Sequence, residues 1–484
     1  MTQFIGGKWS KGSGQVFASL NPATGGEVWS GSASDVGDVD RAVSAARAAF
    51  IDWSMTSFDE RLKVIRQYGN IVAEKKEELA ALISSETGKV IWDARGEAGA
   101  MAGKIEISIK SYEERTGSRE TVSGAVRSRL THRAHGVMAV FGPYNFPGHL
   151  PNGHIVPAII AGNTVVFKPS ELTPCVAEKM VSYWQEAGLP SGVLNLVQGG
   201  KDTGVALAGH DLIDGLLFTG SATTGRLLAR QLSHRPEVIL ALEMGGNNAL
   251  IFDDVADLRA AAVMTINSAF ISSGQRCTCA RRLIVPTGQK GDAFIKILVE
   301  AMDGIVVGSG EEAYMGPVIS EAAADTVLKA QTSLLEQGAK SIRPTERLML
   351  GPAWLSPGLI DVTTIKDRPD EEVFGPLLQL IRVADLKEAV DVANDTHFGL
   401  AAGLLSDNEQ AYEYFYPRIK AGIVNWNQQL TGAASTAPFG GPGWSGNHRP
   451  SAYYAADYCA WPVASIENTD NKVMLAAMPV GLNF

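Results

Sequence analysis

The sequence predicts an α/β protein with two doubly wound units and a β-strand arm outside both. From residue 138, short apolar runs alternate with helical stretches, which predicts parallel strands joined by crossover helices. A second alternating region runs from about residue 250 to 440. Segments with the alternation or aromatic content of exposed strands, near 121–131 and 455–467, predict the arm.

The first unit is read in chain order from its apolar spacing. Residues 36–112 are expected to be helical, because apolar residues recur every three or four positions, notably over 39–50 and 60–86. The expected strands are 138–141, 164–167, 193–197, 215–218 and 238–242. The expected helices between them are 149–161, 174–187, 202–209 and 222–232. Ligands of such sheets bind at the carboxyl ends of the strands.

The second unit is expected to start near Glu243. Its expected strands are 249–252, 283–285, 377–381, 402–405 and 422–425. The predicted domain boundaries are therefore 1–118 with 136–242, then 243–450, with 119–135 and 451–484 as the arm and tail. Exposed strands in an arm need a covering partner, and a second subunit is the natural one.

Composition excludes several classes of protein. Forty-two Lys and Arg against 52 Asp and Glu give a net charge of −10, with no footprint for nucleic acid or an anionic membrane. The sequence contains no apolar run of about 18 residues, so we expect no membrane-spanning helix. The first residues lack the layout of a signal peptide. Four cysteines form no disulfide framework, and neither they nor the histidines show a metal-ligand spacing. We expect a cytoplasmic, metal-free enzyme.

Cys277 is the most informative cysteine. It follows Gly274, which permits a sharp bend, and Arg276, whose charge favours a thiolate. These features suit a nucleophile, although a buried apolar cysteine fits them equally well. Cys279 has no preceding glycine turn and is read as a buried residue.

Two polar residues follow predicted strands. Glu243 ends an apolar strand, where a carboxylate is costly to bury unless it works or is paired. It is read as a general base or as a solvated turn residue. Asn145 lies between Pro143 and Pro147, and its amide is read as a fixed donor for an oxyanion or as part of a rigid turn.

Other segments suit a nucleotide less specifically. Lys168 and Glu171 follow a strand and could address ribose hydroxyls. Residues 218–225 lead from a strand into a helix whose free N–H groups suit a phosphate, although the segment lacks the Gly-x-Gly-x-x-Gly fingerprint. A helix cap is the alternative. On composition alone, 371–376 and 438–441 are structural loops.

Together these segments resemble the aldehyde dehydrogenase superfamily over essentially the whole chain, in order and in spacing. The matching motifs are Pro143–Pro147, Lys168–Glu171, Phe218–Ser221, Glu243–Asn247, Gly274–Cys277, Glu372–Pro376 and Pro438–Gly441. Longer segments at 141–154, 275–282 and 445–459 resemble the branch that oxidises N-succinylglutamate 5-semialdehyde with NAD in arginine breakdown. Tyr144 and Met244 depart from the superfamily but agree with that branch. Another γ-semialdehyde or an aliphatic aldehyde is the alternative substrate.

The resemblance implies a covalent mechanism. Cys277 would attack the aldehyde carbon, the Asn145 amide and the Cys277 N–H would hold the oxyanion, and Glu243 would activate water against the resulting thioester. Lys168 and Glu171 would bind the adenosine ribose, and the Glu171 carboxylate would favour NAD over NADP. The other implied NAD ligands are Gly220, Ser221, Ala222, Thr223, Thr224, Gly225, Glu372 and Phe374.

The resemblance also implies partners and a domain assignment. The substrate carries carboxylates away from its aldehyde, and Arg276 and Arg449 are the candidate cations to meet them; a surface or interface salt bridge is the alternative for each. The first unit would bind NAD, the second would be catalytic, and the arm would build a homodimer or a dimer of dimers. A cysteine hydrolase leaves the seven ordered motifs unexplained, and a non-catalytic homologue would lack Cys277, Glu243 or Asn145.

Overall fold

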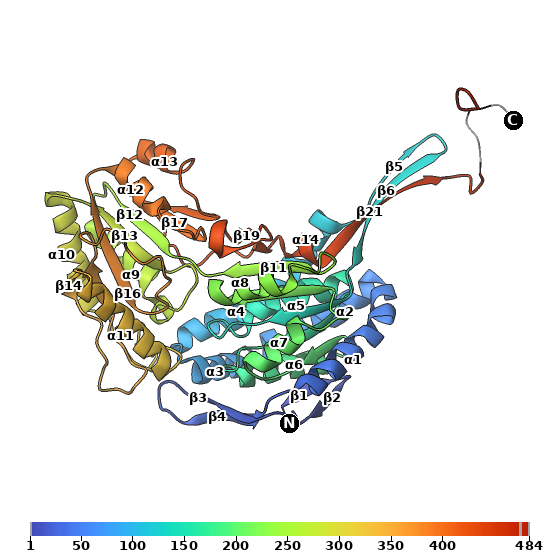
Figure 1. Cartoon of the computed structure of the whole chain (residues 1–484), viewed down its shortest axis with the longest axis horizontal. Helices are drawn as coiled ribbons and strands as arrows, with labels where there is room; N and C mark the ends of the chain where they lie inside the picture. Colours follow the sequence, from blue (N-terminus) through green and yellow to red (C-terminus); the bar gives the residue numbers. More distant parts are fainter. Residues whose placement is uncertain (1, 474–476, 483–484) are drawn as a thin grey trace.

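The computed structural model describes residues 2–473 and 477–482 and confirms two α/β units, each built around a seven-stranded sheet (Figure 1). Residues 474–476 and 483–484 of the predicted tail lie outside the described residues. Separate hydrophobic cores fill the two units.

The first sheet has the strand order β11-β10-β7-β8-β9-β1-β2. Its strands are β1 (Gln3–Ile5), β2 (Lys8–Ser10), β7 (Val137–Phe141), β8 (Thr164–Lys168), β9 (Leu194–Leu196), β10 (Gly215–Gly220) and β11 (Ile239–Met244). β7 to β11 are parallel, and β7 and β8 are entirely buried, which explains their continuous apolar runs. The chain order reverses between β7 and β10, so a ligand is expected at their carboxyl ends.

The predicted helices of the first unit are confirmed, with one correction. They are α1 (Val36–Met55), α2 (Phe58–Glu74), α3 (Lys76–Thr87), α4 (Ile91–Thr116), α5 (His149–Ala161), α6 (Pro174–Glu186), α7 (Lys201–Ala208) and α8 (Ala222–Leu232). The helical stretch expected over 60–86 is two helices that meet at Lys75. The apolar spacing continues on both sides of this break and therefore could not reveal it. The N-terminal strands β1, β2, β3 (Val16–Leu20) and β4 (Glu27–Ser32) were not predicted.

The second sheet has the order β14-β15-β16-β13-β12-β17-β18, with only the β14–β15 pair antiparallel among the described strands. Its strands are β12 (Asn248–Phe252), β13 (Ala280–Pro286), β14 (Lys340–Arg343), β15 (Gly358–Asp361), β16 (Leu377–Val383), β17 (Ala401–Leu405) and β18 (Ile423–Trp426). Its helices are α9 (Leu258–Ala269), the 3-10 turn η1 (Ile271–Gly274), α10 (Gln289–Asp303), α11 (Glu321–Glu336), α12 (Leu386–Asn394) and α13 (Glu409–Phe415). The short strands β14 and β15 were not predicted.

The arm is a three-stranded antiparallel sheet of β5 (Arg119–Ser123), β6 (Val126–Ala134) and β21 (Ala460–Asn468), and it projects from the first unit (Figure 1). Two expectations are corrected. Residues 121–131 form a hairpin that turns at Gly124, where φ is +60°, instead of one strand. The first part of 455–467 is the helix α14 (Ala455–Cys459).

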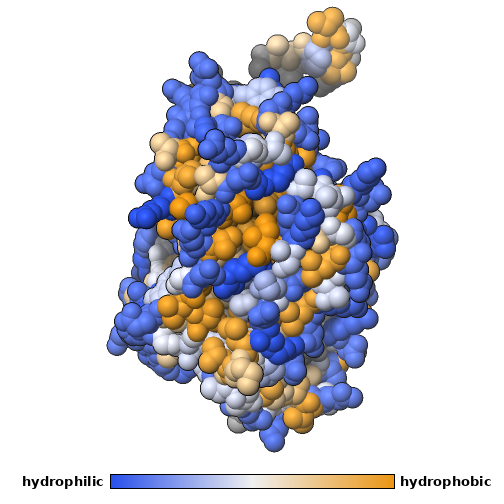
Figure 2. Space-filling view, turned by 90° about the vertical axis from the view of Figure 1, so that its left-hand side faces the viewer, coloured by the Kyte–Doolittle hydropathy of each residue, from blue (hydrophilic) through white to orange (hydrophobic). Residues whose placement is uncertain are grey.

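The segment between β18 and α14 returns to the junction of the two units through β19 (Pro438–Phe439), the 3-10 turn η2 (Gly443–Ser445) and β20 (Ser451–Ala452). Viewed from the side of the second unit, the surface has an area of hydrophobic side chains surrounded by hydrophilic ones (Figure 2). None of the helices in the described part of the chain is long and apolar enough to cross a membrane.

Candidate active site

A cleft of about 1070 Å³ lies between the two units. Its walls from the first unit are the segments that follow β7, β8, β9 and β10 and the end of β11. Its walls from the second unit precede β13, β16 and β17. The carboxyl edge of one sheet thus faces the amino edge of the other. The rule that ligands bind at carboxyl ends holds for the first unit only, because Cys277 lies before its strand.

Glu243 lies near the end of β11, with its side chain in this cleft. It is 3% exposed, and neither carboxylate oxygen has a hydrogen-bond partner among the described residues. Burial raises the pKa of this carboxyl well above its ordinary value. The segment 438–441 passes close by, since a Cβ at Gly440 would lie 3.0 Å from Glu243 Oε2. A buried carboxylate of this kind binds a proton more strongly than an exposed one, which suits a general base.

Cys277 follows a turn in an unfavourable backbone conformation. Ser272, Ser273 and Gly274 have φ values of +53°, +56° and +72°, which only glycine adopts without strain. Side-chain hydrogen bonds hold the two serines: Ser272 Oγ donates to Asp93 at 2.5 Å, and Ser273 Oγ donates to the Gly316 carbonyl at 2.6 Å. The fold therefore fixes the position of the nucleophile loop.

The surroundings of the Cys277 thiol correct one expectation. Burial, Glu243 and Glu372 raise its pKa, and Arg281 is the cation that opposes them. Arg276, the cation expected beside the thiol, is instead paired with Asp93. The thiol is therefore protonated at rest and needs a base, and Glu243, which lines the same cleft without a hydrogen-bond partner among the described residues, can serve.

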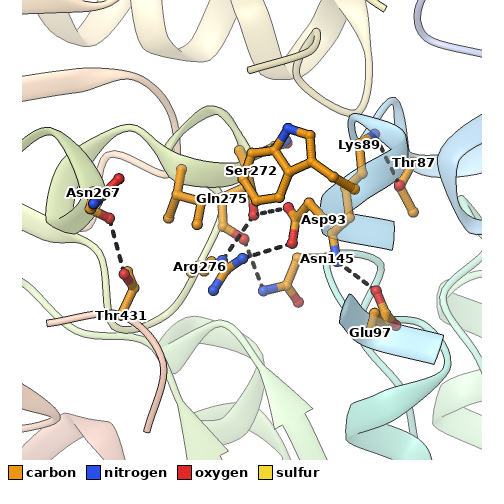
Figure 3. Close-up of polar contacts among 12 residues, drawn as sticks. Thr87, Lys89, Asp93, Glu97, Asn145, Asn267, Ser272, Gln275, Arg276 and Thr431 are labelled. Carbon is orange, nitrogen blue, oxygen red and sulfur yellow. Dashed lines mark hydrogen bonds and ion pairs between the residues drawn. The ribbon is translucent and has the colours of Figure 1, made fainter. Parts of the chain in front are cut away.

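Asn145 and the backbone of Cys277 both provide hydrogen-bond donors at the cleft. Asn145 is buried, and its Nδ2 donates to the Gln275 carbonyl at 3.0 Å, which fixes the amide and leaves its second N–H free (Figure 3). The Cys277 N–H donates to no described residue. Two such donors beside a thiol can hold the oxygen of an attacked carbonyl.

The two predicted substrate arginines lie in different environments, and neither lines the cleft. Arg276 is held by α4: its Nη2 contacts Asp93 Oδ1 at 2.7 Å, and its Nε donates to Ser272 Oγ (Figure 3). Its Nη1 has no partner among the described residues. Arg449 is exposed, and its charge acts on His135.

Most of the predicted nucleotide-binding residues line the cleft. Lys168 is buried, with Nζ 2.9 Å from the Pro169 carbonyl and 4.0 Å from Glu171 Oε2. Ala222 and Thr223 form the start of α8, where the N–H groups have no acceptor within the helix. Both residues line the cleft. Gly225 is an exception, because it is buried against Met244 and does not line the cleft.

The surroundings of Glu372 favour the binding of a ligand that carries hydroxyl groups. Glu372 lies in the cleft, and burial raises its pKa while Arg281 lowers it. A Cβ at Gly245 would lie only 1.7 Å from Glu372 Oε2, so this close approach requires glycine. Together with Lys168, Glu171 and the start of α8, this donor and acceptor set fits a dinucleotide.

Sequence reasoning missed two residues that hold the site. Arg281 is fully buried and links the Gly274 and Arg276 carbonyls to Glu372. Asn248 donates to the carbonyls of Cys277 and Cys279 at 2.7 and 2.9 Å. A buried arginine or asparagine at the start of a strand does not change the hydrophobic periodicity of the sequence. The only available signal was that Arg281 and Asn248 are polar residues beside apolar runs.

His154 is a further missed residue. Its ring bridges Thr219 Oγ1 at 3.0 Å and Tyr458 Oη at 2.9 Å. Thr219 is in register with Glu243 on the neighbouring strand. Burial lowers the pKa of His154 to about 3, so the ring is neutral and links α5, the sheet and α14 by hydrogen bonds alone.

A family model described as the aldehyde dehydrogenase family matches residues 9–461 of this chain. A protein of Paraburkholderia xenovorans strain LB400, named N-succinylglutamate 5-semialdehyde dehydrogenase, is 56% identical over 484 residues, 99% of each chain. A protein of the same name from Chromobacterium violaceum is 57% identical over 482 residues, again 99% of each. The solved structure of an indole-3-acetaldehyde dehydrogenase in complex with NAD⁺ superposes with a TM-score of 0.91 at 29% identity, covering 96% of each chain.

Proposed function

The chain belongs to the aldehyde dehydrogenase family, and from this premise we propose that it oxidises N-succinylglutamate 5-semialdehyde to N-succinylglutamate with NAD. The observation that carries the proposal is the meeting of Cys277, Glu243 and the Asn145 amide at one cleft. The choice of this substrate is supported by the full-length similarity to proteins that are named for it. The place of the reaction in arginine breakdown follows from the sequence resemblance.

The first half of the reaction forms a covalent adduct. Glu243 takes the thiol proton, the Cys277 sulfur bonds to the aldehyde carbon, and the carbonyl electron pair moves to oxygen. The Asn145 Nδ2 and the Cys277 N–H then stabilise that oxyanion, and one such donor is worth about 3 kcal/mol. Bound NAD supplies the acceptor for the hydride that leaves the former aldehyde carbon, and a thioester remains on Cys277.

The second half of the reaction releases the acid. Glu243 first releases the thiol proton to solvent and then takes a proton from water, the hydroxyl oxygen bonds to the thioester carbon, and the carbon–sulfur bond breaks with its electrons on Cys277. The buried, unpartnered state of Glu243 supports this role, because its raised pKa makes the carboxylate a stronger base than an exposed one.

The proposed cofactor contacts follow the cleft wall. Lys168 and Glu171 hold the adenosine ribose, where the carboxylate disfavours a 2′-phosphate and hence NADP. The segment Gly220–Gly225 receives the diphosphate through its N–H groups, and its last glycine provides close packing instead of a contact. Glu372 and Phe374 hold the nicotinamide ribose and ring. On this basis 1–118 with 136–242 is the NAD-binding domain and 243–450 the catalytic domain.

The arm supports a proposal about assembly. The arm exposes Val122, Val126 and Ile466, and its outer strands β5 and β21 have unpaired edges, which suit a neighbouring subunit in a homodimer or a dimer of dimers. All four cysteines are free thiols, which supports a reducing compartment such as the cytoplasm.

A panel of aldehydes tests the proposal. Purified protein is assayed with N-succinylglutamate semialdehyde, succinate semialdehyde and propanal, each with NAD and NADP, by the absorbance of the reduced cofactor. We expect the highest kcat/KM for the first substrate with NAD. A higher value for another semialdehyde would favour the alternative substrate, and turnover without any nicotinamide would contradict the reaction.

A further inference from the structure

One side of α4 buries polar residues along its whole length. The spacing of three, four or seven residues places these side chains on one face of the helix. They are Asp93, Glu97, Lys104, Ser108 and Ser111. We call this set the α4 polar stripe. Core helices normally bury apolar side chains there, so each polar member calls for a partner.

The ends of the α4 polar stripe are fully partnered. Asp93 binds Arg276 and Ser272, as described above. Glu97 binds Lys89 Nζ at 2.5 Å and accepts the Gly148 N–H at 2.9 Å and the His149 N–H at 3.2 Å. Ser111 Oγ donates to a carbonyl at the other end. These contacts anchor α4 to the nucleophile loop, to the start of α5 and to the segment before α14.

The middle of the stripe has no partner. Lys104 is 2% exposed, and its Nζ forms no hydrogen bond to any described residue. Ser108 Oγ, one turn further along α4, is equally buried and unpartnered. Leaving an ammonium buried without a partner costs several kcal/mol, so stability alone does not explain this lysine.

The opposite wall of this unpartnered region is α5, which packs against α4. Lys104 crosses α5 at Gly153, where a Cβ would lie 3.9 Å from Lys104 Cε. His149, one turn earlier on the same face of α5, also has a buried and unpartnered Nδ1. Burial and the charge of Lys104 lower the pKa values of His149 and His154, to about 4 and about 3.

The charge balance of this region favours an anion. Burial lowers the pKa of Lys104 to about 8, and no acidic side chain offsets that effect. The histidines beside it are neutral at pH 7. A carboxylate would therefore meet one ammonium, one hydroxyl and one ring nitrogen, each able to donate a hydrogen bond to it.

The region also lies next to the reaction centre. α5 begins directly after the loop of Asn145, and its residue Leu150 lines the cleft. His154 joins α5 to Thr219, which also lines the cleft. α5 therefore connects the region around Lys104 with the cleft that holds Cys277.

We propose that Lys104, assisted by Ser108 and His149, binds the carboxylate at the far end of the substrate. This inference rests on the proposed function, which supplies a substrate with two carboxylates. It assigns the charge recognition to a lysine that sequence reasoning did not select. Arg276 already has Asp93 as its counter-ion, and Arg449 is exposed away from the cleft, whereas Lys104 lacks any counter-ion.

The variant Lys104→Met keeps the length and removes the charge. Lys110→Met, on an exposed position of the same helix with a side chain 68% exposed, is the matched control. We expect Lys104→Met to raise KM for N-succinylglutamate semialdehyde about tenfold to a hundredfold, as for a lost charged hydrogen bond, with a much smaller change in kcat. KM for propanal should change far less. The Kd of N-succinylglutamate, measured by calorimetry, should weaken by the same factor.

Several outcomes would overturn the inference. Equal losses on propanal and on the charged substrate would mean that Lys104 supports the fold, and an unchanged KM for the charged substrate would mean that it touches no carboxylate. If Lys104→Met does not fold, Lys104→Arg and Ser108→Ala replace it, with a smaller KM increase expected on the charged substrate only; equal effects on propanal would again contradict the inference.

The failure of the proposed function is distinguishable from the failure of this inference. If the wild type does not oxidise N-succinylglutamate semialdehyde, the proposed substrate is wrong. The role of Lys104 is then tested separately, by comparing kcat/KM for succinate semialdehyde with kcat/KM for propanal. A preference for the anionic aldehyde that Lys104→Met abolishes supports the lysine, and a preference that survives the substitution overturns it.

Discussion

The start of α4 and the junction of β11 with the nucleophile loop both bury charged groups, but they treat them differently. At the start of α4, Lys89 faces Glu97 at 2.5 Å, and Asp93 faces Arg276 at 2.7 Å. At the junction, the Glu243 carboxylate has no partner at all among the described residues. Both regions lie beside the nucleophile loop. Their different treatment of charge therefore reflects what the charged groups do, and not where they lie.

The difference shows how this fold separates positioning from reaction. A paired buried charge fixes geometry, and breaking it costs about 3–5 kcal/mol. An unpaired buried carboxyl has a raised pKa and is ready to exchange a proton with something absent from the resting protein. Lys104 belongs with Glu243 in this respect, although it lies on the same helix as the paired charges.

The largest effect on activity is expected from removing the sulfur of Cys277, because no other group can form the covalent bond to the substrate. Cys277→Ala should abolish NAD reduction, because no covalent adduct forms. The Kd of NAD, measured by calorimetry, should stay nearly unchanged, since the thiol only borders the cofactor. Cys279→Ala, a buried neighbour, is the control and should keep most activity. An inactive Cys279→Ala beside an active Cys277→Ala would contradict the assignment of the nucleophile.

The unpaired carboxyl should give the next largest effect. Glu243→Gln keeps the size of the side chain but accepts no proton. Steady-state turnover should fall by roughly 10²- to 10⁴-fold. Because Glu243 takes the thiol proton as well as the water proton, the burst of NADH before the steady state should slow by a comparable factor, measured by stopped flow. A burst at the wild-type rate followed by a slow phase would restrict Glu243 to the hydrolysis of the thioester.

The same substitution should change the pH dependence of stability. The raised pKa means that folded Glu243 holds its proton to a higher pH than the unfolded chain does. Stability from this group is therefore complete below about pH 4.5 and is lost as pH rises through the raised pKa. Glu243→Gln removes that loss, so its Tm should exceed that of the wild type increasingly toward alkaline pH, as scanning calorimetry would show. A Tm difference that does not depend on pH would contradict the unpaired state of the carboxyl.

The sequence predicted the regular parts of the fold well for physical reasons. The buried parallel strands read as apolar runs, and α5, α6, α7 and α8 are separated from them by clear changes of period. The break at Lys75 and the turn at Gly124 were missed because the pattern on each side is uninterrupted. The N-terminal strands β1 and β2 have only three residues each, and β3 and β4 bury only one residue each, so no apolar run marks them.

The site was predictable only where a polar residue follows an apolar strand. Glu243 and Asn145 stood out in this way, and the cysteine loop stood out by its glycine. The positive φ values of Ser272 and Ser273 and the pairing of Arg276 with Asp93 were not predictable, because they depend on contacts between residues distant in sequence. Charge alone could not show which cations were already neutralised.

A substitution at the paired region should reduce activity through geometry. Asp93→Asn removes the counter-ion of Arg276 and weakens the acceptor for Ser272, so the nucleophile loop loses an anchor. We expect a loss of roughly 3–5 kcal/mol in stability, from urea unfolding, and a decrease in kcat of up to about a hundredfold. Glu113→Gln, an exposed carboxylate on the same helix, is the control and should change neither. Full kcat in Asp93→Asn would show that the anchor is dispensable.

The smallest effect is expected at Arg449, a charge that belongs to neither region. The resemblance made it a candidate for the substrate carboxylates, but it is exposed and is not part of the cleft wall. Exposed substitutions change free energies by about 0.5 kcal/mol or less, which is roughly a twofold change in an equilibrium constant. Arg449→Ala should therefore leave KM for N-succinylglutamate semialdehyde within about twofold of the wild type. An increase of tenfold or more, with propanal unaffected, would mean that the loop before β20 moves onto the bound substrate and that Arg449 shares the task assigned here to Lys104.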